Sequence, residues 1–350
     1  MSEIKVLVVD DSAYSRQTIR KMLETEPNIR VIGVASNGID AMFKTLKLKP
    51  DLITLDIEMP EMDGFTFLRW LMKERPTPVI MVSSYSDNRT VFKALELGAV
   101  DFIAKPTTKK ASIELHGIKK DLLSKVRGIK SLRMDRLSKN LELLMKEGTL
   151  RVSSITQEGH NIEVIAVGAS TGGPAAIQII LTRLPSDFSA GVVISQHMPR
   201  GFTASFAERL DKISGVRVKE AEEGDEVKKG TVLICPGGSH MSFRRRGQKI
   251  FTTIKESTQM DKYIPSVDTM MSSVSEHFGS RAMGVILTGM GSDGKVGMLE
   301  IKNRGGYTIA ESEETAVVFG MPSEVINTGA AERILPISEI PAEIIRMTRR

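Results

Sequence analysis

The chain has 350 residues, of which 41% are hydrophobic and 26% charged, and this is ordinary for a globular protein long enough for two domains. No apolar run approaches the roughly 18 residues that a membrane span needs, and the N-terminus has no basic and apolar leader. The single cysteine, Cys235, excludes an internal disulfide, so we expect a cytoplasmic protein without membrane insertion.

The formal net charge of +5 is concentrated in residues 109–151, and the rest of the chain is slightly negative. A basic patch confined to one middle segment is weak support for a DNA-binding domain. We therefore expect no nucleic-acid partner.

The first 107 residues alternate apolar runs with helical patterns. Continuous Val/Ile/Leu runs are typical of strands that are buried on both faces of a parallel sheet. Five strand–helix units predict a doubly wound α/β domain, closed by a helix over 111–127. The expected strands are 4–10, 30–36, 52–56, 78–84 and 101–106, and the expected helices between them are 13–25, 38–48, 64–73 and 88–97.

A basic segment follows this region. After it, apolar runs again alternate with helical patterns. Leucines at helical spacing, such as Leu137, Leu141 and Leu144, allow a short amphipathic helix within the basic segment. The fold prediction is therefore α/β, with two doubly wound parallel-sheet domains, flavodoxin-like and then Rossmann-like. The expected strands of the second region are 164–170, 191–197, 230–238, 283–290 and 305–311, and the expected boundaries are 1–127, a linker over 128–158 and 159–350.

Charged and hydroxyl residues collect at the carboxyl ends of the first set of strands, where open α/β sheets bind ligands. They are Asp10, Asp11, Asp56, Ser83 and Lys105. Any one aspartate could be a turn or helix-cap residue. Three carboxylates at one edge repel each other unless a cation lies among them, and oxygen ligands suit Mg²⁺. A phosphoryl group could then bind there and be accepted by an aspartate.

Residues 1–107 resemble a response-regulator receiver, on the segments VVDDS and LDIEMPEMDG and the Lys–Pro pair that follows the last strand. The resemblance implies that Asp56 is phosphorylated and that Ser83 and Lys105 contact the phosphoryl oxygens. It also implies a Mg²⁺ site made by Asp10, Asp11, Asp56 and the backbone carbonyl of Glu58.

The sharpest signal in the second region is the segment GASTGGP, residues 168–174, after an apolar strand. A G-x-S-x-G turn between strand and helix exposes a serine hydroxyl, here Ser170, next to the free N–H groups of a helix N-terminus. The same glycines could cradle a phosphate or simply make a tight turn, although the lysine of a P-loop is missing. The motif alone leaves these three interpretations open.

A nucleophilic serine needs a base, and two histidines, His197 and His240, follow predicted strands as Ser170 does. Position alone favours His197 only slightly. Asp293, on the Gly-rich loop of MGVILTGMGSDG, could orient the base. Cys235 is the competing nucleophile, but a lone cysteine is more often a small buried residue.

Residues 160–345 resemble the methylesterase domain of the chemotaxis protein-glutamate methylesterases, the CheB family, on GASTGGP, SQHMPRGFTASFAERL, PGGSHM and ILTGMGSDG. Joined to a receiver in this order, the whole chain resembles that family. The resemblance implies a phosphorylation-activated hydrolase without a cofactor of its own, which demethylates glutamyl esters and deamidates glutamines. The implied roles are nucleophile for Ser170, base for His197, orienting carboxylate for Asp293 and an oxyanion-hole N–H for Met290.

The implied partners are the cytoplasmic helices of chemoreceptors as substrate and the chemotaxis histidine kinase as phosphodonor. The alternative function is a response regulator whose output domain binds DNA or a nucleotide without catalysis. DNA binding would call for a basic recognition helix, and the second region has Gly-rich strand-end loops instead.

Overall fold

The structure, a computed structural model, describes residues 3–83, 88–105, 112–129, 132–145, 161–258 and 260–348. Within these ranges the chain divides into two compact units, Met1–Leu137 and Ser138–Arg350. The predicted linker contains a helix, α6 (Met134–Met145), and its residues 146–158 lie outside the described ranges. The boundaries predicted at 127 and 159 stay predictions.

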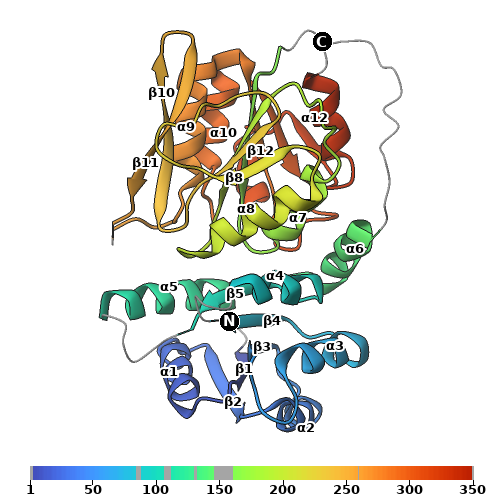
Figure 1. Ribbon diagram of the computed structural model, residues 1–350. Helices are drawn as coiled ribbons and strands as arrows, with labels where there is room; N and C mark the ends of the chain where they lie inside the picture. Colours follow the sequence, from blue (N-terminus) through green and yellow to red (C-terminus); the bar gives the residue numbers. More distant parts are fainter. Residues whose placement is uncertain are drawn as a thin grey trace. The chain divides into compact units, whose positions relative to one another are not determined.

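The first unit is a five-stranded, all-parallel sheet in the order β2-β1-β3-β4-β5. Helices α1 and α5 share a hydrophobic core with one face, and α2 and α3 lie on the other (Figure 1). The elements are β1 (Ile4–Val9), α1 (Ala13–Leu23), β2 (Ile29–Ala35), α2 (Gly38–Leu48), β3 (Leu52–Asp56), α3 (Gly64–Glu74), β4 (Val79–Ser83), α4 (Asn88–Glu96), β5 (Asp101–Ala104) and α5 (Ser112–Gly128).

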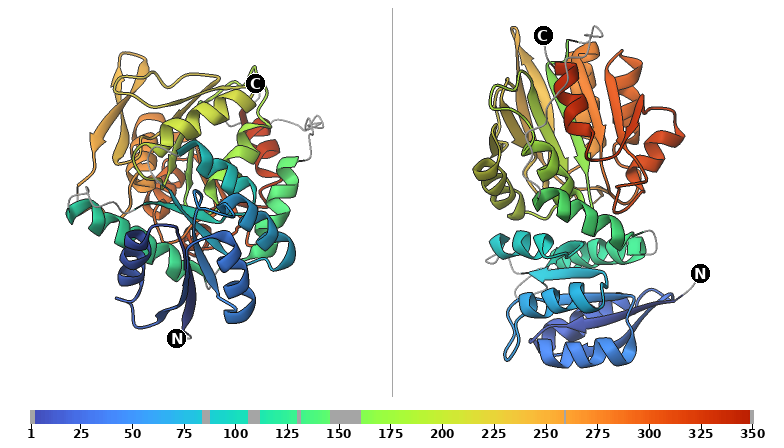
Figure 2. Two further views of the ribbon diagram at one scale, coloured as in Figure 1. Left: turned by 60° about the horizontal axis from the view of Figure 1, so that its bottom comes forward. Right: turned by 90° about the vertical axis from the view of Figure 1, so that its right-hand side faces the viewer.

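The second unit contains a seven-stranded parallel sheet in the order β14-β13-β12-β6-β7-β9-β8 and a separate antiparallel hairpin, β10–β11. Its strands lie between helices in the right-hand view of Figure 2. The elements are β6 (Val164–Ala169), α7 (Gly173–Leu181), β7 (Gly191–Gln196), α8 (Phe202–Ile213), β8 (Arg217–Glu220), β9 (Thr231–Ile234), β10 (Ser239–Arg246), β11 (Lys249–Glu256), α9 (Val267–Phe278), the 3₁₀ turn Gly279–Arg281, β12 (Ala282–Ile286), α10 (Lys295–Asn303), β13 (Tyr307–Glu311), α11 (Met321–Asn327), β14 (Arg333–Leu335) and α12 (Ile340–Thr348).

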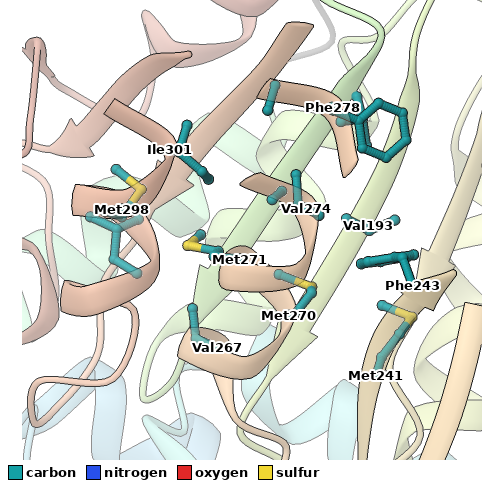
Figure 3. Packing of buried hydrophobic residues seen from close by; sticks show 14 of the residues in the cluster. Val193, Met241, Phe243, Val267, Met270, Met271, Val274, Phe278, Met298 and Ile301 are labelled. Carbon is teal, nitrogen blue, oxygen red and sulfur yellow. The ribbon is translucent and has the colours of Figure 1, made fainter. Parts of the chain in front are cut away.

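Helix α9 is central to the core of the second unit. Its residues Met270, Met271 and Val274 pack between the sheet, helix α10 and the hairpin, as Figure 3 shows. Gly297 of α10 lets the two helices approach closely, because a Cβ there would lie 2.4 Å from the Met271 Cβ. Helices α9 and α10 therefore pack with little space between them.

The predicted fold class is confirmed: both units are parallel-sheet α/β domains. Four strands, β8, β10, β11 and β14, were not predicted from the sequence. Strands β8 and β14 are short edge strands with partly exposed residues, so they lack the continuous apolar run of a buried strand. In β10 the buried residues Met241 and Phe243 alternate with less buried polar ones, which is the half-buried pattern.

Candidate active site and phosphorylation site

The carboxyl ends of β1, β3 and β5 bring the predicted acidic residues together. The carboxylate oxygens of Asp10, Asp11 and Asp56 lie within 4.8 Å of one another. Lys105, directly after β5, places its Nζ 2.5 Å from Asp56 Oδ2, 3.4 Å from Asp10 Oδ1 and 3.8 Å from Asp11 Oδ1. One ammonium group thus faces three carboxylates.

Burial raises the pKa of Asp56 to about 6, and the neighbouring charge of Asp10 adds to the rise, while Lys105 opposes it. Burial also raises the pKa of Asp10, against the hydrogen bond that the Ser15 hydroxyl donates to it at 2.6 Å. The single ammonium group of Lys105 therefore does not balance the negative charge of the three carboxylates. An all-oxygen donor set in that condition fits a hard divalent cation such as Mg²⁺.

Two further residues belong to the predicted phosphorylation site, Glu58 and Ser83. Glu58 follows β3 by two residues, and its carbonyl accepts no hydrogen bond within the described ranges, so it is available as a ligand. Ser83 ends β4, but its side chain lies outside what the structure describes. The motif's Gly64 folds the chain back onto the strand, since a Cβ there would lie 2.2 Å from the Asp56 carbonyl oxygen.

Ser170 follows β6, which lies between β12 and β7 in the second sheet. Its N–H donates to the Thr288 carbonyl at 3.0 Å, and the Gly173 N–H donates back to the Ser170 carbonyl at 2.7 Å. Gly172 supplies the left-handed conformation of this turn, with φ of 78°. Ser170 is 9% exposed, and its hydroxyl makes no hydrogen bond among the described residues.

His197 and Asp293 form a direct pair, with 2.8 Å between His197 Nε2 and Asp293 Oδ2. The backbone N–H of His197 donates to the Ala169 carbonyl at 3.1 Å, so the imidazole and Ser170 follow adjacent strands at the same level. The Tyr263 ring stacks on the imidazole, with centroids 5.3 Å apart and planes 4° from parallel. Nε2 is therefore engaged by a carboxylate, and Nδ1 is the nitrogen left to act as a base.

The N-terminus of α9 holds the Asp293 carboxylate. Oδ2 accepts from the Val267 N–H at 2.7 Å, and Oδ1 accepts from the Asp268 N–H at 2.9 Å and from the Ser266 hydroxyl at 3.2 Å. Burial alone would raise the pKa of Asp293. Its hydrogen bond and charge interaction with His197, together with these backbone N–H groups, outweigh burial and lower the pKa.

Asp268 mirrors this arrangement. Asp268 lies in the first turn of α9, and its carboxylate accepts the Gly297 N–H of α10 at 2.8 Å. Asp293 precedes α10, and its carboxylate accepts the Asp268 N–H of α9. Burial and then the charge of Asp293 raise the pKa of Asp268 to about 6, against the pull of the Gly297 N–H. The two helices thus cap each other with a carboxylate.

Two other groups border Ser170. The Gln196 side-chain amide donates to the carbonyls of Ser170 at 3.1 Å and of His197 at 3.0 Å, and so joins the two segments. A Cβ at Gly289 would lie 2.8 Å from Ser170 Cβ, so the loop that follows β12 approaches the serine closely. The next residue, Met290, has a backbone N–H that makes no hydrogen bond in the described ranges.

The structure separates the two candidate bases. His240 does not contact Asp293; instead, its Nδ1 accepts the Ser266 N–H at 3.0 Å, and its Nε2 lies 3.2 Å from Asp261 Oδ2. Cys235 is fully buried, and burial raises the pKa of its thiol. A buried, protonated thiol is a poor nucleophile, which favours Ser170.

Several residues at this site were not predicted from the sequence. They are Gln196, Tyr263 and Ser266, together with the N–H groups of Val267 and Asp268. The one available signal was Ser266, a good N-cap residue ahead of the helical pattern of α9. Nothing in the sequence indicated that this cap would meet Asp293, because the contact is between distant segments.

Family models of known proteins match both regions of the chain. The CheB methylesterase family model matches residues 165–344, and the response regulator receiver domain matches residues 6–115. The receiver domain predicted at the N-terminus is thus present. None of the helices in the described ranges combines the length and apolarity needed to cross a membrane.

Named relatives align with nearly the whole length of the chain. A Geobacter sulfurreducens protein named protein-glutamate methylesterase/protein-glutamine glutaminase 3 is 48% identical, over 99% of this chain and 98% of its own. A Pyrococcus abyssi protein of the same activity name is 40% identical, over 98% of this chain and 93% of its own.

Among solved structures, the catalytic domain of Thermotoga maritima CheB methylesterase is 44% identical, with a TM-score of 0.52, and the match covers 53% of this chain and 98% of that domain. These matches and the geometry of the two sites lead to one conclusion: the chain belongs to the CheB methylesterase family, with a receiver domain ahead of the catalytic one.

Proposed function

We propose that this chain is a phosphorylation-activated serine hydrolase of chemotaxis adaptation. It cleaves glutamyl methyl esters and deamidates specific glutamines on the cytoplasmic helices of chemoreceptors. The observation that carries the proposal is the His197–Asp293 pair beside Ser170, at the carboxyl ends of three adjacent strands. The names of relatives at 40–48% identity over nearly the whole chain support the reaction.

In the proposed reaction the Ser170 hydroxyl attacks the γ-carbonyl carbon, and His197 Nδ1 removes the hydroxyl proton. The carboxylate of Asp293 stabilises the imidazolium that forms. His197 then gives its proton to the departing methanol, or to ammonia when the substrate is a glutamine. Water, deprotonated by the same imidazole, hydrolyses the acyl-enzyme to the free glutamate.

Among the described residues, Ser170 and His197 are not hydrogen-bonded. Because Asp293 and Tyr263 both contact the imidazole, we propose that the serine hydroxyl moves to form this hydrogen bond when substrate binds. Such contacts often tighten only when substrate binds. The free N–H of Met290 would then donate to the oxyanion, and one such donor typically contributes about 2.7–4 kcal/mol to transition-state stability.

In the receiver domain we propose that Asp56 accepts the phosphoryl group from the chemotaxis histidine kinase. Asp10, Asp11, Asp56 and the Glu58 carbonyl would hold Mg²⁺, which when bound offsets the negative charge of the incoming group. Lys105 is placed to pair with phosphoryl oxygens, because it already contacts Asp56. We propose that Ser83 contributes its hydroxyl there and that the protein acts in the cytoplasm.

Substitution of Ser170 by alanine tests the function. We expect methanol release from methylated chemoreceptor to fall by about 10⁴-fold or more, because the nucleophile is lost. The matched control is Ser195→Ala: Ser195 is fully buried on β7, and its hydroxyl has no hydrogen-bond partner among the described residues. Near-normal turnover by Ser170→Ala would exclude the serine mechanism.

A further inference from the structure

The second histidine at the edge of the catalytic sheet, His240, makes contacts that the reaction described above does not use. Its side chain, on β10, is 12% exposed. The Ser266 N–H donates to Nδ1 at 3.0 Å, so Nδ1 carries no proton. The proton of the neutral imidazole is then on Nε2, which lies 3.2 Å from the carboxylate of Asp261.

Asp261 is itself held in place. Its Oδ2 accepts the Thr258 N–H at 2.6 Å and the Thr258 hydroxyl at 3.0 Å. The Thr258 N–H, followed by the adjacent His240 imidazole, lowers the pKa of Asp261 to about 2. An ionised carboxylate beside Nε2 favours the tautomer that leaves Nδ1 free to accept the Ser266 N–H.

Ser266 connects this pair to the catalytic residues. It is the N-cap of α9: its hydroxyl accepts the Thr269 N–H at 3.1 Å and donates to Asp293 Oδ1 at 3.2 Å. The next two N–H groups along the chain, of Val267 and Asp268, donate to the same carboxylate. His240 thus binds the backbone at Ser266, the residue at which α9 begins to donate hydrogen bonds to Asp293.

We propose that His240 is a positioning residue. With Asp261 it forms a second imidazole–carboxylate pair, which anchors the N-cap of α9 and, through it, the orientation of Asp293 toward His197. His240 does not touch the reacting atoms in this role. The inference rests on the proposed function, because Asp293 matters only if His197 is the base.

The test compares His240→Ala, His240→Asn and His240→Gln in the full chain with a saturating small phosphodonor, using methylated chemoreceptor as substrate. In the asparagine variant, Oδ1 occupies about the place of Nδ1 and can accept the Ser266 N–H, whereas the longer glutamine side chain carries its amide toward Asp261. We expect His240→Ala and His240→Gln to lower kcat by about 10- to 100-fold with an unchanged KM, because small misplacements of catalytic groups have effects of this size.

His240→Asn should retain kcat within about threefold of the wild type, because it keeps the acceptor. The matched control is His277→Ala: His277 lies near the other end of α9, where Nδ1 is 2.9 Å from the Ser273 carbonyl oxygen. Its kcat should equal that of the wild type. A His240→Ala enzyme with normal kcat, or a His240→Asn enzyme as slow as His240→Ala, would overturn the proposal.

If His240→Ala does not fold, as judged by circular dichroism, Asp261→Ala replaces it, since Asp261 is partly exposed. We expect a smaller fall in kcat there, about two- to tenfold, at constant KM, and an unchanged kcat would reject the role. Ser170→Ala is measured alongside. If that variant stays active, the proposed function fails; if it is inactive while the His240 series behaves like the wild type, only the positioning role fails.

Discussion

Asp56 and Asp293 are the same residue type in nearly the same setting, yet their electrostatics are opposite. Both lie at the carboxyl edge of a parallel sheet, and they are 4% and 2% exposed, respectively. Burial and a neighbouring carboxylate raise the pKa of Asp56 to about 6, whereas His197 and the start of α9 lower the pKa of Asp293 despite its burial.

The difference lies in the partners. Asp293 receives four hydrogen bonds that are fixed by the fold, three of them from the start of α9. Within the described ranges, Asp56 receives only the Ile57 N–H and Lys105, and it faces two other carboxylates. A carboxylate whose donors are all present suits a permanent orienting role. A carboxylate with too little positive charge around it suits a site where a cation and a phosphoryl group bind and leave.

The largest expected effect is on turnover in Asp293→Asn. The amide has one oxygen, which accepts, and one nitrogen, which donates. It would therefore stabilise the wrong tautomer of His197, and kcat should fall by about 10⁴-fold. Methanol release from methylated receptor measures this. A fall of less than about tenfold, with the fold intact, would mean that Asp293 does not orient the base.

The same substitution at the other aspartate should leave the chemistry intact. We expect Asp56→Asn to keep the basal kcat of the unphosphorylated chain but to lose all activation by a small phosphodonor, because no acyl phosphate can form. Chelation of Mg²⁺ should likewise abolish activation of the wild type. Activation that survives in Asp56→Asn would place the phosphorylation site elsewhere.

The smallest effect is on folding stability, where the two substitutions should have opposite signs. Asp293 has a lowered pKa, so its stabilising contribution is present above the unfolded-state pKa of about 3.9 and is lost as the pH falls through the lower folded-state value. Its loss in Asp293→Asn should lower the free energy of unfolding by about 2–4 kcal/mol at pH 7.

Asp56 has a raised pKa, so its ionisation opposes folding above pH 6 and not below about pH 3.9. Without Mg²⁺, Asp56→Asn should stabilise the receiver by about 1–3 kcal/mol at pH 8, and the gain should shrink between pH 6 and pH 4. Trp70, the only tryptophan, lies on α3 and reports urea unfolding of this domain by fluorescence. A destabilised Asp56→Asn variant at pH 8 would contradict this interpretation of the carboxylate cluster.

The sequence by itself determined the two α/β domains and the groups that end their strands. Apolar runs and Gly-rich turns are local features, and the carboxyl ends of parallel strands meet at one edge. Asp10, Asp56, Lys105 and Ser170 could therefore be assigned to such edges from local patterns alone. The half-buried hairpin β10–β11 was missed, because its alternating pattern is weaker than a continuous apolar run.

Position in the sequence left the partner of Asp293 open and the family resemblance implied His197, but only the tertiary structure shows the pairing. His197 and His240 both follow strands, and the choice depends on how a loop after β12 and the N-terminus of α9 pack against the sheet. The stacking of Tyr263 and the donors that lower the pKa of Asp293 have the same origin. Such contacts join segments tens of residues apart, and their geometry is set by packing rather than by any local pattern.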